Sequence, residues 1–597
     1  MCRIAGIFNG GEANLPARIV AMRDAMAHGG PDDAGVFIHP HLPLALGHRR
    51  LSLIDLTAAG HQPMHLQQRG LTIVYNGEIY NYRELRNTLT HYGYTFTTAS
   101  DTEVILHAYA HWGVDAFAFL NGMFALALWD EQQQELILAR DHAGIKPLYY
   151  SIQNDTLFFA SEIRAFAHAG YSFTENPQWK TAFLAFGHLP EPVTTLHNVK
   201  PLPKGTALLI RLPQLQQRQY PFFTWKCTGA LTFENDAVPL LHQTLTDAVN
   251  RHLIADAPIG VFLSGGIDSS LLSIVAAKTH QKQLHTLSII FKEKKFSEES
   301  YQQLVVDLIQ SHHQAYLVTK DDFINSLPDV MRAMDQPSLD GINTYFISKY
   351  AKAYGLKAVL SGLGADELFG GYPSFRQKNN IRLLRIIPDS LLQILQWLPD
   401  QRLRKLSYGS ADNPVQEYLL LRGIFTPRAI AEQLDASESE VKSLLASISS
   451  WYHPNGFEGG NRISWLETNF YMQNQLLKDS DYMSMWHGLE LRVPFLDKEV
   501  MQMAGEINSE LKFNHSLPKY LLVQAFRNEL PEAVWNRKKQ GFTFPFEGWL
   551  KENEFIQPGS SSESKLYSRF RKGKLSWGRY WCALLMNRFE QKEPIAA

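Results

Sequence analysis

The sequence predicts a multidomain α/β protein, and three observations support this fold class. The chain has 597 residues, of which 45% are hydrophobic, enough for two to four domains of about 150 residues with cores of their own. Short β-branched and aromatic runs fill the first two hundred residues, whereas strand and helix patterns alternate further on. From about Asn379 onward the pattern is mostly helical.

The N-terminal part predicts sheets that are covered by helices. Asn, Gly and Asp residues separate its apolar runs, which is typical of short strands joined by turns. Two other segments repeat their apolar residues with the period of a helix. The strand patterns occupy residues 42–56, 71–82, 122–141 and 147–161, and the helical patterns occupy Leu15–Ala27 and Asp101–Trp112.

A change of pattern marks the boundary between two domains. Past Leu202 the sequence becomes irregular and ends in QYPFFTWKCTGALTFEN, where turn formers and scattered aromatic residues replace regular periodicity. We therefore predict a first domain at residues 2–210, a linker at 211–235 and a second domain at 236–597.

After this boundary, buried strand patterns alternate with helical ones. The strands are IGVFLS, LHTLSIIF and KAVLSG, and the helices between them are SSLLSIVAAKT and EESYQQLVVDLIQ. This alternation predicts a parallel, doubly wound sheet with right-handed crossovers.

Composition excludes several classes of function. The 57 basic residues nearly balance the 59 acidic ones, so the chain lacks the charge typical of proteins that bind nucleic acid or an anionic membrane. Small neutral or zwitterionic molecules are the expected partners. Three cysteines are too few for a disulfide framework and indicate a reducing compartment. The longest apolar runs fall short of a membrane span or a signal peptide, which predicts a cytoplasmic protein.

The stretch VFLSGGIDSS predicts a phosphate-binding loop. Ser264, Gly265 and Gly266 follow a strand, and Asp268 and Ser269 begin a helix. Glycine allows close approach of an anion, and the helix N-terminus favours negative charge. Because Asp268 would repel phosphate, we expect Mg²⁺ between them, held mostly by Asp268 and phosphate oxygens. The alternative is a Gly-rich turn without a ligand. The sequence contains no GxxxxGK[ST] loop, which argues against transfer of a γ-phosphate.

A second Gly-rich stretch, SGLGADELFGGY, again ends a strand. Ser361, Gly362 and Gly364 precede two acidic residues, Asp366 and Glu367. Such a turn at the carboxyl end of a strand lies at the ligand crevice of an open α/β sheet. The two loops are therefore expected to face one nucleotide, although FGGY alone favours a turn that ends a helix.

Several motifs together resemble the glutamine-hydrolysing asparagine synthetase family. They are Cys2 near the N-terminus, VYNGEIYN, SDTEVI, RDHAGIKPLYY, SGGIDSS, SGLGADELFGGY and LELRVPFLDKE, and they span almost the whole chain. The resemblance implies an N-terminal nucleophile amidotransferase domain with an αββα fold, followed by an adenylating ATP-pyrophosphatase domain. It implies ATP and Mg²⁺ as cofactors and aspartate as the default acceptor, and a homodimer is one possible assembly.

The resemblance assigns roles in a glutamine site. Cys2 is the nucleophile, and removal of Met1 would give it a free α-amine. A thiol of pKa about 8.5 is mostly protonated at neutral pH, so an α-amine that titrates near about 8 can serve as its base. The remaining assignments are Arg50 for the glutamine carboxylate, Glu78 and Asp101 for its ammonium group, and Asn76 with the Gly77 N–H for the oxyanion.

The resemblance also assigns residues in the second domain. Lys519 matches a lysine that contacts the activated intermediate, whereas Met483, Met485 and Trp486 are expected in the core. Asp268 and Asp366 are the expected metal ligands. The expected ATP-binding residues are Leu263, Ser264, Gly265, Gly266, Asp268, Ser269, Ser361 and Gly362.

Two positions depart from the family pattern. HGGPDD places Gly29 where many members have arginine, and we hypothesise that the Arg3 guanidinium fills that space and lowers the thiol pKa of Cys2. Leu363 replaces a glutamate that is the family's candidate for proton transfer as ammonia attacks. Leucine cannot perform this role, so a uronic acid of a polysaccharide or the precursor of a small metabolite is the alternative acceptor.

A different class of function is a non-catalytic protein that senses glutamine or nucleotide. Loss of the nucleophile or of the pyrophosphate loop would be its simplest mark. Cys2, Arg50, Asp101 and the SGGIDS loop are all present, which argues for an enzyme.

Overall fold

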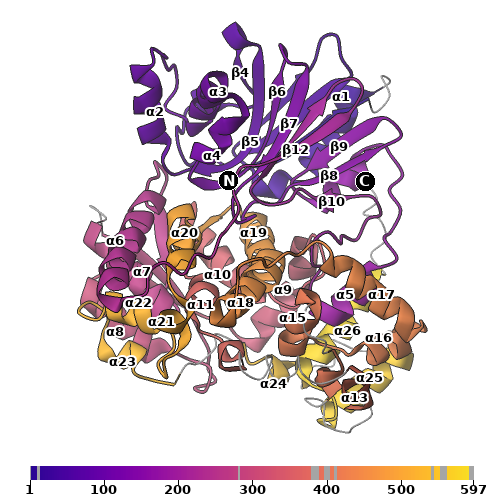
Figure 1. Ribbon diagram of the computed structural model, residues 1–597, viewed down its shortest axis with the longest axis vertical. Helices are drawn as coiled ribbons and strands as arrows, with labels where there is room; N and C mark the ends of the chain where they lie inside the picture. The colour runs from indigo at the N-terminus through magenta and orange to yellow at the C-terminus, as the bar shows by residue number, and fades with distance from the viewer. Residues whose placement is uncertain are drawn as a thin grey trace.

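The computed structural model describes residues 2–9, 14–279, 283–377, 389–395, 404–408, 413–538, 544–551 and 561–590. Strands dominate residues 2–221, which we call the N-terminal half and most of which form the upper part of the molecule in Figure 1. The C-terminal half is mainly helical and lies below it. No helix in these described ranges is both long enough and apolar enough to cross a lipid bilayer.

Two antiparallel sheets of six strands each form the N-terminal part. The first sheet has the order β10-β8-β9-β1-β3-β2 and the second has the order β12-β11-β7-β6-β5-β4. The first comprises β1 Arg3–Phe8, β2 Asp33–Ile38, β3 Leu44–Arg50, β8 Tyr149–Gln153, β9 Thr156–Ala160 and β10 Lys200–Pro201. The second comprises β4 Met64–Leu66, β5 Leu71–Ile79, β6 Gly122–Asp130, β7 Glu135–Arg140, β11 Thr206–Arg211 and β12 Gln216–Pro221.

These sheets form the two middle layers of a four-layered arrangement. One apolar core, which includes Ile4 and Leu138, lies between the sheets. On the outer face of the first sheet, α1 (Leu15–Asp24) packs through Ile19 and Met22. On the outer face of the second, α2 (Tyr82–His91), α3 (Asp101–Trp112) and α4 (Ala116–Phe119) form another core. The predicted αββα layering is therefore confirmed.

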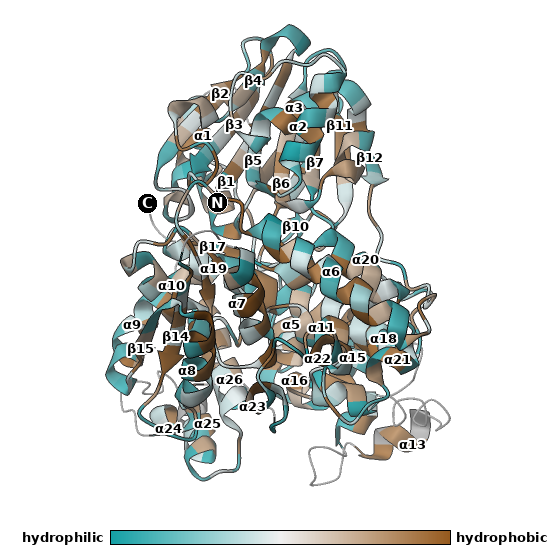
Figure 2. Ribbon diagram, turned by 90° about the vertical axis from the view of Figure 1, so that its left-hand side faces the viewer, coloured by the Kyte–Doolittle hydropathy of each residue, from teal (hydrophilic) through white to brown (hydrophobic). Residues whose placement is uncertain are grey.

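A parallel sheet organises the C-terminal part. Its strand order is β15-β14-β13-β16-β17, and all neighbouring strands run parallel. Apolar residues are frequent in β14 and in α7 (Ile267–Thr279), which are partly brown in Figure 2. The predicted doubly wound sheet is confirmed. The strands are β13 Ile259–Phe262, β14 His285–Ile290, β15 His312–Leu317, β16 Ala358–Leu360 and β17 Glu490–Arg492.

Helices surround this sheet and form most of the remaining C-terminal part, as predicted. Two of them, α19 (Leu477–Trp486) and α22 (Tyr520–Ala525), bear on the sites described below. Another of them is α6 (Glu234–His252). Met483 and Met485 on α19 are buried in the core, as expected, and Trp486 is partly buried against it.

The boundary between the halves differs from the prediction in two ways. The predicted linker contains β12, which pairs with β11 and extends the second antiparallel sheet to Pro221. In addition, α5 (Trp179–Phe186), within the predicted first domain, packs against helices of the C-terminal half, including α16 (Pro427–Leu434) and α26 (Trp577–Glu590). Six of its eight residues are buried, because a helix that is apolar on nearly all sides needs partners all round.

Candidate active sites

The first candidate site surrounds Cys2. This residue immediately precedes β1 and is buried, and its backbone nitrogen donates a hydrogen bond to Asn76 Oδ1 on β5 at 3.2 Å. Burial raises the pKa of the Cys2 thiol to about 11. The thiol is therefore protonated at neutral pH, and nucleophilic attack requires an adjacent base. Met1 lies outside the described residues, so its removal stays a prediction.

Two buried carboxylates lie in the same region. Glu78 is on β5, and Asp101 is the first residue of α3. Asp101 Oδ2 accepts hydrogen bonds from the Tyr75 hydroxyl at 2.9 Å and the Ile79 N–H at 3.0 Å. Burial raises the pKa of Asp101 to about 6 and also raises that of Glu78, which the charges of Glu490 and Asp101 raise further. Such a cluster takes up protons or a cation, and an ammonium group is suitable.

Arg50 and Gly77 complete the predicted residues of this site. Arg50 ends β3, and its guanidinium donates to the backbone carbonyls of Thr57, at 2.8 Å, and Asp55. The charges of Arg50 and Glu78 both affect the thiol pKa of Cys2, so the fold brings these groups together. A Cβ on Gly77 would lie 2.1 Å from the Met123 carbonyl oxygen on β6, so only glycine fits there.

Sequence reasoning missed two residues that the C-terminal half contributes to this region. Arg492 Nη2 on β17 lies 3.8 Å from Glu78 Oε2, and Arg492 Nε lies 2.5 Å from Glu490 Oε1. Both side chains are fully buried. The signal was a charged pair inside the otherwise apolar run LELRVPFL, because buried charges need partners.

The space beside Gly29 is filled as hypothesised. A Cβ on Gly29 would lie 2.8 Å from Arg3 Cγ. However, Arg3 Nε pairs with Glu162 Oε1 at 2.6 Å and Arg3 Nη2 with Asp481 Oδ2 at 2.8 Å, and all three side chains are buried. Successive residues of an extended chain point to opposite faces. The prediction that Arg3 lowers the thiol pKa of Cys2 is therefore wrong, because the Arg3 guanidinium is paired with two carboxylates.

The second candidate site is a cavity of about 1820 Å³ in the C-terminal half. Three of the predicted ATP-binding residues line it: Ser264, Gly266 and Asp268, in the turn between β13 and α7. The others do not line the cavity, but two of them contact residues that do. Ser269 Oγ accepts a hydrogen bond from the Ser264 N–H at 3.1 Å. A Cβ on Gly362 would lie 2.8 Å from the Asp268 Cβ. Leu263, Gly265 and Ser361 are the remaining members of this set.

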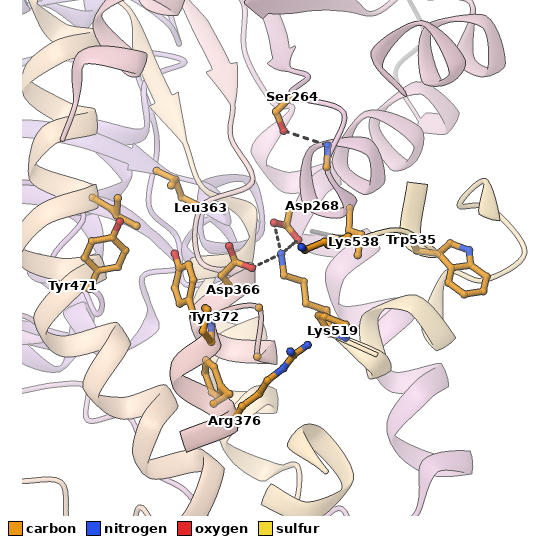
Figure 3. Close-up of a pocket in the computed structure, with 18 of the residues that line it drawn as sticks. Ser264, Asp268, Leu363, Asp366, Tyr372, Arg376, Tyr471, Lys519, Trp535 and Lys538 are labelled. Atoms are coloured by element: carbon orange, nitrogen blue, oxygen red, sulfur yellow. Dashed lines mark hydrogen bonds and ion pairs between the residues drawn. The ribbon is translucent and has the colours of Figure 1, made fainter. Parts of the chain in front are cut away.

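Lys519 connects the two Gly-rich loops. Its ammonium nitrogen lies 2.6 Å from Asp268 Oδ1 and 2.5 Å from Asp366 Oδ1, as Figure 3 shows. Burial alone would lower the pKa of Lys519, but the two carboxylates raise it well above its usual range. Lys519 precedes α22 in the left-handed conformation, with φ of 56°. One predicted carboxylate from each Gly-rich loop therefore contacts the Lys519 ammonium group.

The same two carboxylates fit a magnesium ion. Asp268 and Asp366 both reach one ammonium nitrogen, and carboxylate oxygens are preferred ligands of Mg²⁺. Among the described residues, no group of three or more acidic, His or Cys side chains could enclose a metal. A magnesium ion would therefore need phosphate oxygens and water as its other ligands.

Leu363 lines the cavity at a distance from this charged point. Figure 3 shows it on the side of Tyr471 and Tyr372, with Lys519 beyond Asp366. The neighbouring Glu367 is buried and accepts a hydrogen bond from the Tyr372 hydroxyl at 2.7 Å. Burial and then the charge of Asp366 raise the pKa of Glu367 to about 8. Glu367 is therefore protonated at neutral pH and does not line the cavity in place of the missing acid.

Helix α19 contacts both candidate sites. Asp479 and Ser480 line the large cavity. The next residue, Asp481, pairs with Arg3, the neighbour of Cys2, and with Lys146 Nζ at 2.6 Å. Three consecutive residues of one rigid element therefore connect the large cavity to the strand that carries Cys2.

Comparisons with known proteins agree with the division of the chain into an N-terminal and a C-terminal part. The family model for asparagine synthase matches residues 240–560, and that for the glutamine amidotransferase domain matches residues 1–221. The chain is 34% identical over 570 residues to glutamine-hydrolyzing asparagine synthetase 1 of Bacillus subtilis, covering 93% of this chain and 89% of that protein. It is 31% identical over 583 residues to a putative asparagine synthetase of Mycobacterium tuberculosis, covering 91% and 86%. A protein named amidase chry2 of Gibberella zeae is 27% identical over 605 residues, covering 91% and 87%.

Proposed function

This chain belongs to the asparagine synthase family of carbon–nitrogen ligases, and we propose that it forms an amide from a carboxylate, ATP and glutamine-derived ammonia. The presence of two candidate sites in one chain supports this proposal. Cys2 lies beside Asn76 and near buried acids, and Lys519 lies between Asp268 and Asp366. We further propose that the antiparallel half performs the glutaminase reaction and that the remaining half performs the synthetase reaction, in the cytoplasm.

In the proposed glutaminase reaction, glutamine binds with its carboxylate at Arg50 and its ammonium group at Glu78 and Asp101. The Cys2 thiol, deprotonated by its own α-amine, attacks the side-chain carboxamide. Asn76 and the Gly77 N–H stabilise the oxyanion. Ammonia then leaves, and water hydrolyses the thioester to glutamate. Since burial keeps the thiol protonated, the α-amine is the essential base.

In the proposed synthetase reaction, the acceptor carboxylate attacks the α-phosphorus of ATP and pyrophosphate leaves. Ammonia then displaces AMP from the acyl adenylate and forms the amide. Asp268 and Asp366 would hold Mg²⁺, which neutralises charge on the phosphates when bound. Lys519 can then turn its ammonium group toward the developing negative charge, because it already lies at this point.

Two observations bear on the identity of the acceptor. Aspartate is our default proposal, and the family membership supports it. Leu363 in the cavity wall supports the alternative, a larger carboxylate such as a uronic acid or a metabolite precursor, because leucine can neither move a proton nor bind an ammonium group.

Pyrophosphate release tests both proposals directly. Full-length protein with ATP and Mg²⁺ should release pyrophosphate only when a suitable carboxylate is added, and Asp268→Asn protein provides the blank. Aspartate, glucuronate and a panel of amino-acid carboxylates serve as candidates. Stimulation by one of them, with the corresponding amide as product, supports the function. Absence of stimulation by every carboxylate, with glutaminase activity intact, would contradict the synthetase assignment.

A further inference from the structure

A smaller cavity lies behind one wall of the large one. It encloses about 340 Å³, and its lining, which we call the basic pocket, is Lys405, Arg422, Gly423, Ile424, Ser576, Gly578 and Arg579. Arg422 ends α15 (Pro414–Arg422), and Arg579 lies in the first turn of α26. Three cationic side chains thus converge on a cavity that the proposed reaction does not use.

The residues that the structure describes neutralise the three cations of the basic pocket only in part. Arg422 Nε pairs with Glu467 Oε2 at 2.6 Å, and Arg579 Nε donates to the Ile424 carbonyl at 2.8 Å. Within the described ranges, no carboxylate lies within ion-pair distance of Lys405 or Arg579. Burial, together with the charges of Arg579 and Arg422, lowers the pKa of Lys405 to about 8. Like charges held together away from water are unfavourable until an anion joins them.

The donors of the basic pocket suit a phosphate group. Two guanidinium groups and one ammonium group supply the charge-assisted hydrogen bonds that phosphate oxygens accept. The Ser576 hydroxyl lies at the same place, where α26 begins without an acidic residue in its first turn. The positive end of that helix adds to the field. A volume of about 340 Å³ is at the lower end of the range for small-molecule sites.

We propose that the basic pocket is a binding site for a phosphate-class oxyanion, either free phosphate or pyrophosphate, or the phosphate group of a small metabolite. This site is independent of the proposed function, because binding there requires neither Cys2 nor Asp268. The Arg422 guanidinium also lies 3.8 Å over the Tyr471 ring and 4.4 Å over the Tyr372 ring. Both rings line the large cavity, so an anion that draws Arg422 toward itself shifts the wall of the synthetase site.

Calorimetric titration of the full-length protein with phosphate, pyrophosphate and glucose 6-phosphate, without Mg²⁺, tests this site. Because the large cavity also contains cations, the part of the binding that is lost on substitution of the basic pocket, and not the total heat, reports this site. The Lys405→Gln/Arg579→Gln protein should bind at least about tenfold more weakly. A matched control, Arg428→Gln/Lys442→Gln, removes two cations that pair with Glu432 and Glu438 on other helices and should bind normally.

Equal affinity in all three proteins, or no binding of any of the three probes to the wild type, overturns the proposal. Among positive results, preference for phosphate or pyrophosphate identifies a free anion as the ligand, whereas preference for glucose 6-phosphate identifies a phosphorylated metabolite.

A second measurement needs no variant. Acetic anhydride modifies lysines in their neutral form, so Lys405, with a pKa of about 8, should react readily in the wild type. Phosphate should reduce its acetylation severalfold by mass spectrometry and leave the exposed Lys442 unaffected. Equal acetylation of Lys405 with and without phosphate would also overturn the proposal.

Discussion

The two candidate active sites carry opposite electrostatic problems before any substrate is bound. Around Cys2, burial raises the pKa of Asp101 to about 6 and that of Glu78 well above its usual range, so these acids tend to hold protons. In the large cavity, Asp268 and Asp366 are instead neutralised by the Lys519 ammonium group within 2.6 Å. The first site therefore has acids that can bind a cation, whereas the second already contains the Lys519 ammonium group between its two carboxylates.

This difference in charge matches the charges of the two proposed substrates. Glutamine brings an ammonium group that replaces protons in a closed site. ATP brings several negative charges, so the second site needs additional positive charge, and Mg²⁺ can supply it. The contrast predicts that each site can be disabled without affecting the chemistry of the other.

Cys2→Ala should give the largest separation. Glutamine-dependent amide formation should fall by about 10⁴-fold or more, as for loss of other catalytic nucleophiles. Synthesis from added ammonia should continue, because the large cavity does not use the thiol. Comparison of amide formation with the two nitrogen donors measures this. Mass spectrometry of active wild-type protein should also find no Met1, and retention of Met1 would refute the α-amine mechanism.

Asp268→Asn should produce the reverse pattern. A neutral amide leaves Lys519 with one carboxylate and binds Mg²⁺ poorly, so pyrophosphate release should fall by at least about 10²-fold. Glutamine hydrolysis should remain near the wild-type rate, measured as glutamate formed without ATP. Wild-type pyrophosphate release by this variant would show that the SGGIDSS loop has been wrongly assigned.

Leu363→Glu tests whether the second site lacks an acid that the reaction with aspartate needs. If the absence of an acid limits the reaction with aspartate, the substitution should raise aspartate-dependent amide formation by about 10²-fold, as is typical of a general base. Leu363→Gln, similar in size but without charge, is the matched control. A wild-type enzyme that already converts aspartate at about 1 per second or faster would show that Leu363 is no defect.

Arg3→Gly tests the connection between the sites. It leaves the buried Glu162 and Asp481 without a shared partner, which should destabilise the fold by about 3 kcal/mol or more and reduce the glutaminase rate. Adding Gly29→Arg should restore both, because its side chain would enter the vacated space. Thermal unfolding and glutamate release are the measurements, and independent, additive effects of the two substitutions would contradict the idea.

The pH dependence should be the mildest effect. Asp101 must be ionised to bind the glutamine ammonium group, and its pKa is about 6. As the pH falls through 6, Asp101 gains a proton, so kcat/KM for glutamine should decrease by up to about tenfold per pH unit. Asp101→Asn should lower kcat/KM at neutral pH and remove this inflection. An inflection that persists in the variant would assign it to another group.

Most of the fold could be predicted from local patterns, and several of the exceptions depend on long-range contacts. The helix at Asp101–Trp112 agrees with the prediction, and the strands β13, β14 and β16 fall inside the predicted runs. The exposed, largely polar β15 and the three-residue β17 lack the apolar pattern of a buried strand. The docking of α5 onto the C-terminal half depends on partners more than two hundred residues away, which periodicity does not encode.

The sites show the same limit. Cys2 and Asn76 were paired in advance only through the family resemblance, and the structure adds their contact. Arg492 approaches Glu78 from a sequence distance of over four hundred residues, so no local rule could connect them. The prediction that Arg3 fills the space beside Gly29 was correct. The predicted effect of its charge on Cys2 was wrong, because its guanidinium pairs with Asp481, which belongs to the other half of the chain.

The shared space of Arg3 and Gly29 also constrains how this protein could have changed during descent. An arginine cannot move between these positions in two neutral steps. If Arg3 is lost first, Glu162 and Asp481 lose a buried partner, and if arginine enters at position 29 first, it collides with Arg3. Related chains should therefore carry the arginine at one position and a small residue at the other, with few lineages preserving an intermediate.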